Sequence, residues 1–256
     1  MNLSAGTDFN QYTMYGGRMR CNVADDGTIN AFYGDSTYTE DGSNGQVMVY
    51  QPKFYYQRIP LKTENMKIGK IVRKESILLS TTKQSGFKLH PIFDAGNGEE
   101  LDYVLFGAYD GSNINNRLAS ISGQKPLSSI TLINAEALAA ARGAGWHITN
   151  MAAESVQQML EMVEFGTMNG QAALEAGISN ITNTPSNVNC GSITGSTAAL
   201  GNNTGAAEST INEIDGTEST FTTAGQRAIS YRGFENPWGN MWRFIGGLII
   251  YGDGKM

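Results

Sequence analysis

Residues 230–244 read SYRGFENPWGNMWRF, and this stretch indicates more about the fold than any other part of the chain. Its tryptophans, Trp238 and Trp242, are four positions apart, so they would share one face if the segment were a strand. Two indoles buried on that face would stabilise a core by on the order of several kcal/mol. We therefore predict a strand over residues 241–244 with Trp242 in the core. Trp238 follows Pro237 in a turn, and we expect it either in the core or at a ligand.

The residues on either side of this stretch differ in composition. Residues 227–232, with Ile229 and Tyr231 two positions apart, and the apolar residues 248–251 predict two further strands. Residues 178–225, in contrast, are mostly Asn, Thr, Ser and Gly with few large apolar side chains. Such a segment can bury little apolar surface, so we predict a long polar surface loop there.

The middle of the chain predicts helices. Asn134 is placed to cap a helix over residues 135–142, which Gly143 would end. Residues 146–148 predict a short strand, and Asn150 is placed to cap a longer second helix, in which apolar side chains recur at helical spacing. That apolar stripe consists of Ala152, Val156, Met159, Leu160 and Val163. The last prediction in this region is a short third helix, at residues 171–176.

Residues 1 to about 110 predict strands and turns. Turn sequences rich in Asp, Asn and Gly recur along them and separate short β-prone runs. The predicted strands span residues 29–33, 46–50, 54–59, 68–72 and 103–109. Such strands followed by helices indicate an α+β fold with antiparallel strands, two main helices and long loops. We divide the chain into an N-terminal strand and turn segment, residues 1–45, and a main domain, residues 46–256.

Composition narrows the classes of function. The 256 residues are 40% apolar but only 16% charged and include 31 glycines, which indicates a loop-rich domain with a surface of amides and hydroxyls. A net charge of −6 disfavours a nucleic-acid partner. The apolar run at residues 244–251 is far shorter than the roughly 20 residues that span a bilayer, and residues 1–9 show no signal peptide. We therefore expect synthesis in the cytoplasm without membrane insertion.

The common catalytic motifs are missing from the sequence, which contains no P-loop, GxSxG, HExxH or GxGxxG. His90 and His147 are the only histidines, and we interpret each as a partly buried residue bonded to the backbone. Cys21 and Cys190 form no CxxC pair, which leaves either two free thiols or one bridge, and a Cys–His pair stays open. The turn at residues 41–45 lacks the EF-hand pattern, so we interpret it as a turn rather than a calcium site.

Residues 239–244, Gly-Asn-Met-Trp-Arg-Phe, resemble the G-N-x-W-E-W motif of the formylglycine-generating-enzyme-like branch of the C-type lectin fold. Residues 135–142, 145–149 and 152–154 are similar to that family's first helix, its R-L-P-T-E segment and the start of its second helix. Residues 46–59 resemble its opening strands. The resemblance implies a C-type-lectin-like fold for this chain.

The whole layout looks more closely like a group of bacteriophage structural proteins that carry such a domain. These proteins share the patterns at residues 26–28, 41–49, 86–91 and 231–236, and the resemblance covers residues 21–244. Related phage proteins use the lectin fold to hold variable loops against molecules of the bacterial surface.

The chain also departs from the enzymes of that family. Asn236, Gly239 and Met241 match the region that surrounds a calcium ion in the enzymes, but Arg243 stands where the calcium-binding Glu would be. A guanidinium cannot coordinate calcium, so we expect Arg243 to donate to the nearby carbonyls, with no metal and no cofactor. The paired active-site cysteines of the enzymes follow this motif, whereas no cysteine follows Cys190 here. The sugar-binding triplets Glu-Pro-Asn and Trp-Asn-Asp of animal lectins are absent too.

The resemblance implies a non-enzymatic phage virion protein, without catalytic residues, that binds a glycan or protein of the bacterial surface. The expected structural motif is formed by Asn236, Gly239, Asn240, Trp242 and Arg243. The expected ligand contacts are Asn180, Asn202 and Asn203 in the polar loop, together with Tyr231 and Trp238. We also expect contacts with other virion proteins and a homo-oligomer, because avidity commonly raises weak single-site binding.

Two rival hypotheses remain open. In the first, the chain is a purely structural tail, baseplate or head-decoration protein whose domain only packs against its neighbours. In the second it is a formylglycine-type oxidase, which would require Cys21 and Cys190 to be essential and to bind a metal. The chain stops before the closing strands that are usual for the fold, which predicts either a domain completed by a partner chain or a fragment.

Overall fold

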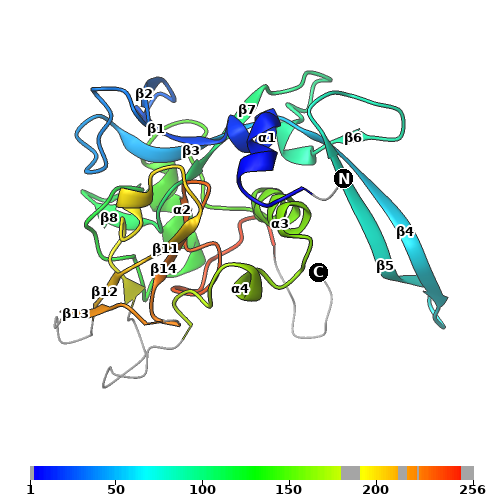
Figure 1. Ribbon diagram of the computed structural model, residues 1–256. Coiled ribbons are helices and arrows are strands. Elements are labelled where there is room, and N and C mark those ends of the chain that lie inside the picture. Colours follow the sequence, from blue (N-terminus) through cyan, green and yellow to red (C-terminus); the bar gives the residue numbers. More distant parts are fainter. Residues whose placement is uncertain (1–2, 180–190, 213–217, 224, 249–256) are drawn as a thin grey trace.

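The computed structural model describes residues 3–179, 191–212, 218–223 and 225–248. Within these ranges, helices and mostly antiparallel strands form an α+β structure, as the sequence predicts (Figure 1). The strands predicted over residues 29–109 are all present, although their bounds differ.

A four-stranded antiparallel sheet with the order β2-β1-β3-β7 forms the centre of the molecule. Its strands are β1 (Met19–Val23), β2 (Ile29–Phe32), β3 (Gln46–Pro52) and β7 (Tyr103–Gly107). Strand β1 pairs with β3 along its whole length, and Cys21 lies opposite Met48. The N-terminal residues therefore share one sheet with the strands that come after residue 46. Val47 and Val49 of β3 are fully buried in the main core.

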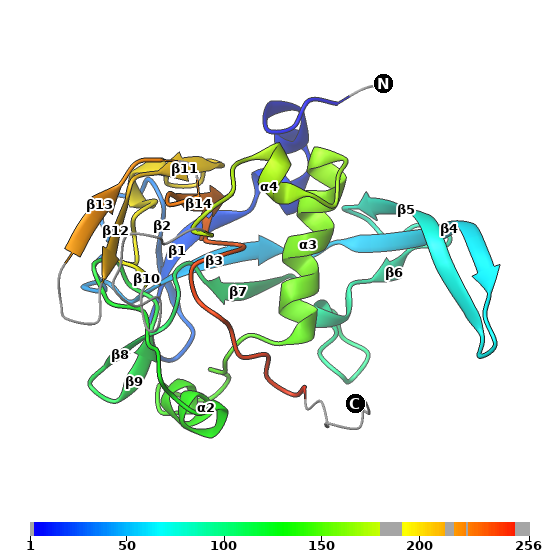
Figure 2. The ribbon, with the colours of Figure 1, turned by 90° about the horizontal axis from the view of Figure 1, so that it is seen from below.

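Helix α3 (Met151–Phe165) lies across this sheet (Figure 2). Asn150 caps its first turn as predicted, because its side-chain oxygen accepts a hydrogen bond from the Ala153 amide at 2.9 Å. Val156 and Leu160 of the predicted apolar stripe are completely buried in the main core. Each stabilises the fold by roughly 1.5–3 kcal/mol relative to an exposed side chain. Gly166 ends the helix in the left-handed conformation, with a φ of 64°.

The remaining helices are short. They are α1 (Thr13–Gly16), α2 (Leu132–Ala140), α4 (Gly170–Ala173) and the 3-10 turns η1 (Thr7–Gln11), η2 (Pro91–Phe93) and η3 (Ala198–Leu200). Helix α2 begins earlier than predicted, because Thr131 rather than Asn134 caps it and accepts the Asn134 amide at 3.3 Å. In the described ranges, no helix combines the length and apolar character needed to cross a bilayer.

The predicted strand at residues 146–148 is wrong. Trp146 instead donates its indole N–H to the carbonyl of Asp25 at 2.8 Å, so a side chain rather than a strand partner holds this segment. The neighbouring ribbon of β8 (Ser112–Ile114) and β9 (Arg117–Ala119) is linked to the end of α2, because the Arg142 side chain donates to the Leu118 carbonyl at 2.8 Å.

A long β-hairpin projects from the body of the molecule (Figures 1 and 2). It consists of β4 (Tyr55–Asn65) and β5 (Lys70–Ser80), and β6 (Lys88–Leu89) pairs with the base of β4. At the base, Ile77 and Leu79 pack against the main core, whereas residues 58–70 are all exposed. Both strands are longer than predicted, because their outer halves have no buried face to impose an apolar alternation on the sequence.

The segment predicted as a polar surface loop, residues 178–225, is partly buried. Its described residues and those that come after it form two three-stranded sheets, ordered β10-β12-β13 and β11-β14-β15. The strands are β10 (Gly191–Ser192), β11 (Gly205–Ala207), β12 (Ser209–Asn212), β13 (Glu218–Phe221), β14 (Ala228–Tyr231) and β15 (Phe234–Glu235). Ser192, Thr197 and Ile211 have no exposed surface. The loop prediction is wrong for these residues, because backbone pairing and buried hydroxyl bonds replace apolar contacts.

Buried charged side chains join the N-terminal turns to α3 and β14. The Arg232 guanidinium donates twice to the Glu164 carboxylate, over 2.8 Å from Nε and 2.7 Å from Nη2. The Tyr231 hydroxyl and the Gly6 amide each donate to the same carboxylate at 2.8 Å. The Glu164 side chain is 1% exposed. This carboxylate is therefore removed from water and is compensated by one guanidinium and two neutral donors.

A second buried arginine, Arg20, connects β1 to distant parts of the chain. Its Nε donates to the Gly233 carbonyl at 2.8 Å, and its Nη2 donates to the Thr197 hydroxyl at 3.0 Å. It also forms an ion pair with Glu40 at 3.2 Å. The central strand is thus held by groups from both halves of the sequence.

Candidate functional site

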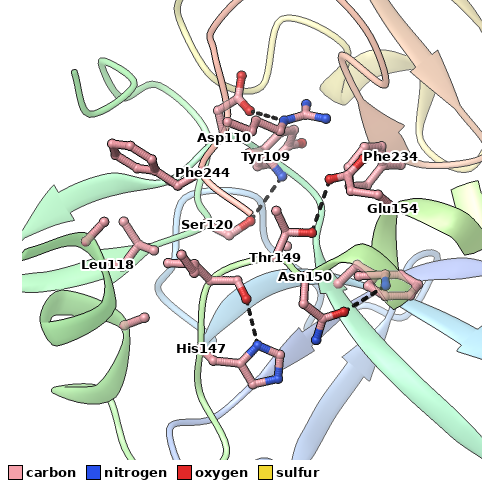
Figure 3. A pocket seen from close by; sticks show the side chains of 18 of the residues that line it. Tyr109, Asp110, Leu118, Ser120, His147, Thr149, Asn150, Glu154, Phe234 and Phe244 are labelled. Atoms are coloured by element: carbon pink, nitrogen blue, oxygen red, sulfur yellow. Dashed lines mark hydrogen bonds and ion pairs between the residues drawn. The ribbon is translucent and has the colours of Figure 1, made fainter. Parts of the chain in front are cut away.

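A large open groove lies on one side of the central sheet, and Figure 3 looks into it. Its volume is about 1080 Å³, slightly above the roughly 300–1,000 Å³ of ligand pockets. Its walls come from β7, residues 126–130, α2, α3 and residues 240–244. Segments that are far apart in the sequence therefore build it.

Left-handed residues shape the chain that leads into the wall formed by residues 240–244. Asn236, Gly239 and Asn240 have φ values of 50°, 74° and 60°. A Cβ at Gly239 would lie 2.5 Å from the Ile178 carbonyl oxygen, so only glycine fits this approach. The chain therefore turns here, and the predicted strand over residues 241–244 is wrong. Trp242 is 103% exposed and not in the core, which corrects the second prediction for this segment.

An arginine, an aspartate and an asparagine fix this wall. Arg243 donates from Nη2 to the Asn236 carbonyl, as the sequence predicts, and from Nε to Asp110 at 3.2 Å. Asn240 donates to the other Asp110 oxygen at 2.7 Å and accepts the Ser192 amide at 2.8 Å. The guanidinium also lies 5.3 Å from the centre of the Phe234 ring. These bonds hold residues 240–244 along the groove.

We expect the substitution Arg243→Met to lower the free energy of unfolding by about 1–3 kcal/mol, because it leaves the Asp110 carboxylate and the Asn236 carbonyl without their charged donor. Chemical denaturation measured by tryptophan fluorescence would show this loss. Arg117→Met is the matched control, since Arg117 and Asp25 form an exposed pair, and it should cost less than about 1 kcal/mol. Equal losses in the two variants would contradict the structural role of Arg243.

The groove combines aromatic rings with hydrogen-bonding groups. Phe244 and Tyr103 are both partly exposed along it, in addition to Trp242. Among the polar residues, the exposed His147 lies with its Nδ1 2.7 Å from the Ile148 carbonyl oxygen (Figure 3). Its Nε2 forms no hydrogen bond with any residue that the structure describes. The Thr149 hydroxyl donates to Glu154 at 3.1 Å. Aromatic surface beside polar groups is suited to binding a ligand by stacking and hydrogen bonds.

The ligand contacts predicted from sequence do not come together on one surface. Tyr231 is fully buried and bonded to Glu164, so the prediction that it contacts a ligand is wrong. Trp238 is half-buried and donates its indole N–H to the Glu175 carbonyl at 3.2 Å. Asn202 accepts the Arg20 amide at 2.7 Å, a structural role, while Asn203 is exposed. The fifth predicted residue, Asn180, lies outside the described residues.

Cys21 and His90, which the sequence left open as catalytic residues, are both buried in the structure. Cys21 is buried beside Val23 and Met48, and burial raises the pKa of its thiol to about 12, which keeps it protonated. His90 is buried, bonds Ser155 through Nε2 at 2.9 Å, and has its pKa lowered by burial to about 4. Cys190 lies outside the described residues. Among the residues that are described, no three metal-ligating side chains gather at one point.

Sequence reasoning missed the groove because residues more than 100 positions apart line it, and no local pattern encodes their meeting. One usable signal was present: Gly239 and Asn240 favour left-handed turns, which argues against a strand through Trp242. Comparison of the sequence with protein-family models and with curated proteins found no match.

Proposed function

We propose that this chain is a non-enzymatic bacteriophage virion protein whose C-type-lectin-like domain binds a glycan of the bacterial surface in the groove. The observation that carries the proposal is the fully exposed indole of Trp242 on the wall of a large groove. Trp and Tyr are enriched at recognition surfaces, because they offer a large contact area at a low cost in conformational entropy, and Phe244 and Tyr103 extend the exposed aromatic surface along the same groove.

The C-type-lectin-like part of the proposal draws support from how the motif residues lie. Residues 239–242 resemble the G-N-x-W motif. Gly239 and Asn240 make a left-handed turn there, and the Asn240 side chain is hydrogen-bonded to Asp110. Arg243 donates to the carbonyl of Asn236, a residue that the resemblance matches to the calcium-binding region of the enzymes. The two main helices, α2 and α3, come after the strands β1 to β9 in the order that the resemblance implies.

Binding without catalysis is favoured by the groove's chemistry. His147 is the only histidine among the described residues that line it, and the carboxylates of Asp110 and Glu154 already accept hydrogen bonds from the protein. The rival oxidase hypothesis needs a reactive Cys21, whose raised pKa and burial make it unsuitable as a metal ligand or nucleophile. A glycan fits the groove better than a charged ligand, because sugar rings offer apolar faces to aromatic rings and hydroxyls to amides and imidazoles.

The test is binding of labelled, oligomerised protein to a panel of intact bacteria, with and without the substitution Trp242→Ala. We expect strain-selective binding that falls about tenfold or more in the variant, as for a central aromatic contact. Met168→Ala is the matched control, because Met168 is a largely exposed apolar side chain outside the groove, and it should bind as the unchanged protein does. Purified surface polysaccharide should compete, while protease treatment of the cells should not abolish binding.

Absence of binding to every strain, with a folded sample, would overturn the proposal. The second candidate function, a purely structural role in a tail, baseplate or head, would then be favoured. The specific observation that favours this role is the β4–β5 hairpin, which projects from the body of the molecule and whose residues 58–70 are all exposed.

A further inference from the structure

The outer half of the β4–β5 hairpin is a two-stranded ribbon without support from the body of its own molecule. Residues 58–70 are all exposed, and both views show the hairpin extending beyond the body (Figures 1 and 2). An isolated two-stranded ribbon is at best marginally stable in water. Several of its apolar side chains face solvent: Leu61, Met66, Ile68 and Val72, of which Ile68 is 95% exposed. This surface is suited to burial against a partner.

The charge of the hairpin is opposite to that of the rest of the protein. Residues 55–80 contain six basic and two acidic side chains, a net charge of +4. Since the whole chain carries −6, the remaining residues carry −10. The hairpin is therefore a basic arm on an acidic protein, and electrostatic attraction favours its contact with a second copy of the same chain.

The lysines of the arm are not neutralised within it. Two arginines form ion pairs, Arg58 with Glu75 and Arg73 with Glu64. Four lysines, all in the described part of the chain, have no ion pair there: Lys62, Lys67, Lys70 and Lys74. Lys62 and Lys74 are even direct cross-strand partners, an arrangement that is unfavourable without an anionic neighbour.

The loop between η2 and β7 has the complementary properties. Residues 94–102 contain four carboxylates and no basic side chain, and Lys53 pairs with two of them, Glu100 and Asp102. Asp94 and Glu99 are exposed and free of ion pairs with described residues. Leu101 and Tyr103 add exposed apolar surface next to them. The loop thus offers negative charge and apolar contact together.

We propose that the β4–β5 arm of one copy docks on the 94–103 loop of a second copy, in a head-to-tail contact. Such a contact uses two different surfaces, so each molecule can still offer its own arm or loop to a further copy. The lysines would meet Asp94 and Glu99, and Leu61, Met66 and Ile68 would cover Leu101 and Tyr103. Leu101 and Tyr103 also line the groove, at the side formed by the start of β7, but the proposal does not rest on glycan binding.

The test compares charge-reversed variants of the full chain by sedimentation velocity over a wide range of concentration. We expect the unchanged protein to self-associate, more weakly at high salt. The arm variant Lys62→Glu, Lys67→Glu, Lys70→Glu should raise the dissociation constant by about tenfold or more. The loop variant Asp94→Lys, Glu99→Lys should do the same. Mixing the two variants should restore association, because each reversed surface then meets its complement.

The matched control carries Lys88→Glu, Arg117→Glu and Lys125→Glu, which change the net charge as the arm variant does but are exposed and lie outside the arm and the 94–103 loop. It should associate as the unchanged protein does, and so should Met168→Ala, which removes an exposed apolar side chain outside the groove. A monomer at every concentration would overturn the proposal, and so would association that the arm variant leaves intact. Arm-dependent binding to phosphatidylglycerol vesicles without self-association would overturn it in favour of a lipid surface. Circular dichroism would verify that each variant is folded.

Discussion

Replacing Glu164 with alanine is expected to lower the free energy of unfolding by about 3–5 kcal/mol, because the Arg232 guanidinium would be left buried without its counter-charge. The same change removes the acceptor for the Tyr231 hydroxyl and for the Gly6 amide. An unpaired charge that has been removed from water costs more than the attraction of the pair alone contributes. The measurement is equilibrium denaturation in urea, with circular dichroism as the signal.

Two further variants make the reason for this loss testable. Glu136→Ala removes an exposed carboxylate from α2 and should change stability by less than about 0.5 kcal/mol. The double variant Glu164→Leu with Arg232→Met removes both charges and should recover a large part of the loss. A double variant that is less stable than Glu164→Ala would show that burial of the charge is not the dominant cost.

The second large effect is a loss of stability as the pH rises from about 4.5 to about 7. Burial raises the pKa of Glu161 to about 7, and one of its carboxylate oxygens has no hydrogen-bond partner in the described part of the chain. Burial also raises the pKa of Glu235 to about 7, although Thr197 and Gly195 donate to it. Each folded-state pKa exceeds the ordinary value of 4.5, so each stabilising contribution is complete below that value and is lost as the pH rises through 7.

The expected loss is about 3 kcal/mol for each carboxyl group between roughly pH 4.5 and pH 7. The substitution Glu161→Gln imitates the neutral acid, so the loss due to this residue should disappear. His90 acts in the opposite direction over about pH 4 to 6.5, because its pKa is lowered, and it cancels in the comparison of the variant with the unchanged protein. Parallel stability curves for the two proteins would contradict the raised pKa of Glu161.

The parts of the fold that sequence predicted best are those where local chemistry and burial agree. For α3, the cap at Asn150 and the apolar stripe were both predicted. Asn150 does cap the helix, and Val156 and Leu160 of the stripe are buried. Residues 228–231 form β14 as expected. The prediction for Trp242 failed because spacing was taken as strand periodicity, whereas Gly239 and Asn240 turn the chain before it. Periodicity is informative only where the backbone is regular, and left-handed residues interrupt it here.

The candidate site was harder to predict, since polar residues there are placed by long-range bonds. Asn202 was predicted to face a ligand because the segment around it is polar. Its side chain instead accepts a hydrogen bond from the backbone amide of Arg20 in β1. Tyr231 likewise belongs to a residue type that is common at ligand contacts, but its hydroxyl donates a hydrogen bond to the buried carboxylate of Glu164. Asn and Tyr are equally suited to either role, and the choice depends on partners that are distant in the sequence. The groove itself depends on the meeting of β7, α3 and residues 240–244, which no single motif encodes.

The buried arginines also constrain the order in which the protein can fold during synthesis. Arg232 donates to the Gly6 carbonyl 226 positions earlier, and Arg20 donates to the Gly233 carbonyl 213 positions later. Until those late residues leave the ribosome, the Arg20 guanidinium on β1 lacks part of the set of acceptors that it has in the closed core. We therefore expect a nascent chain that stops short of residue 232 to stay open and to need protection from aggregation. Completion of the native core is in this sense one of the last events of translation, not a gradual accumulation along the chain.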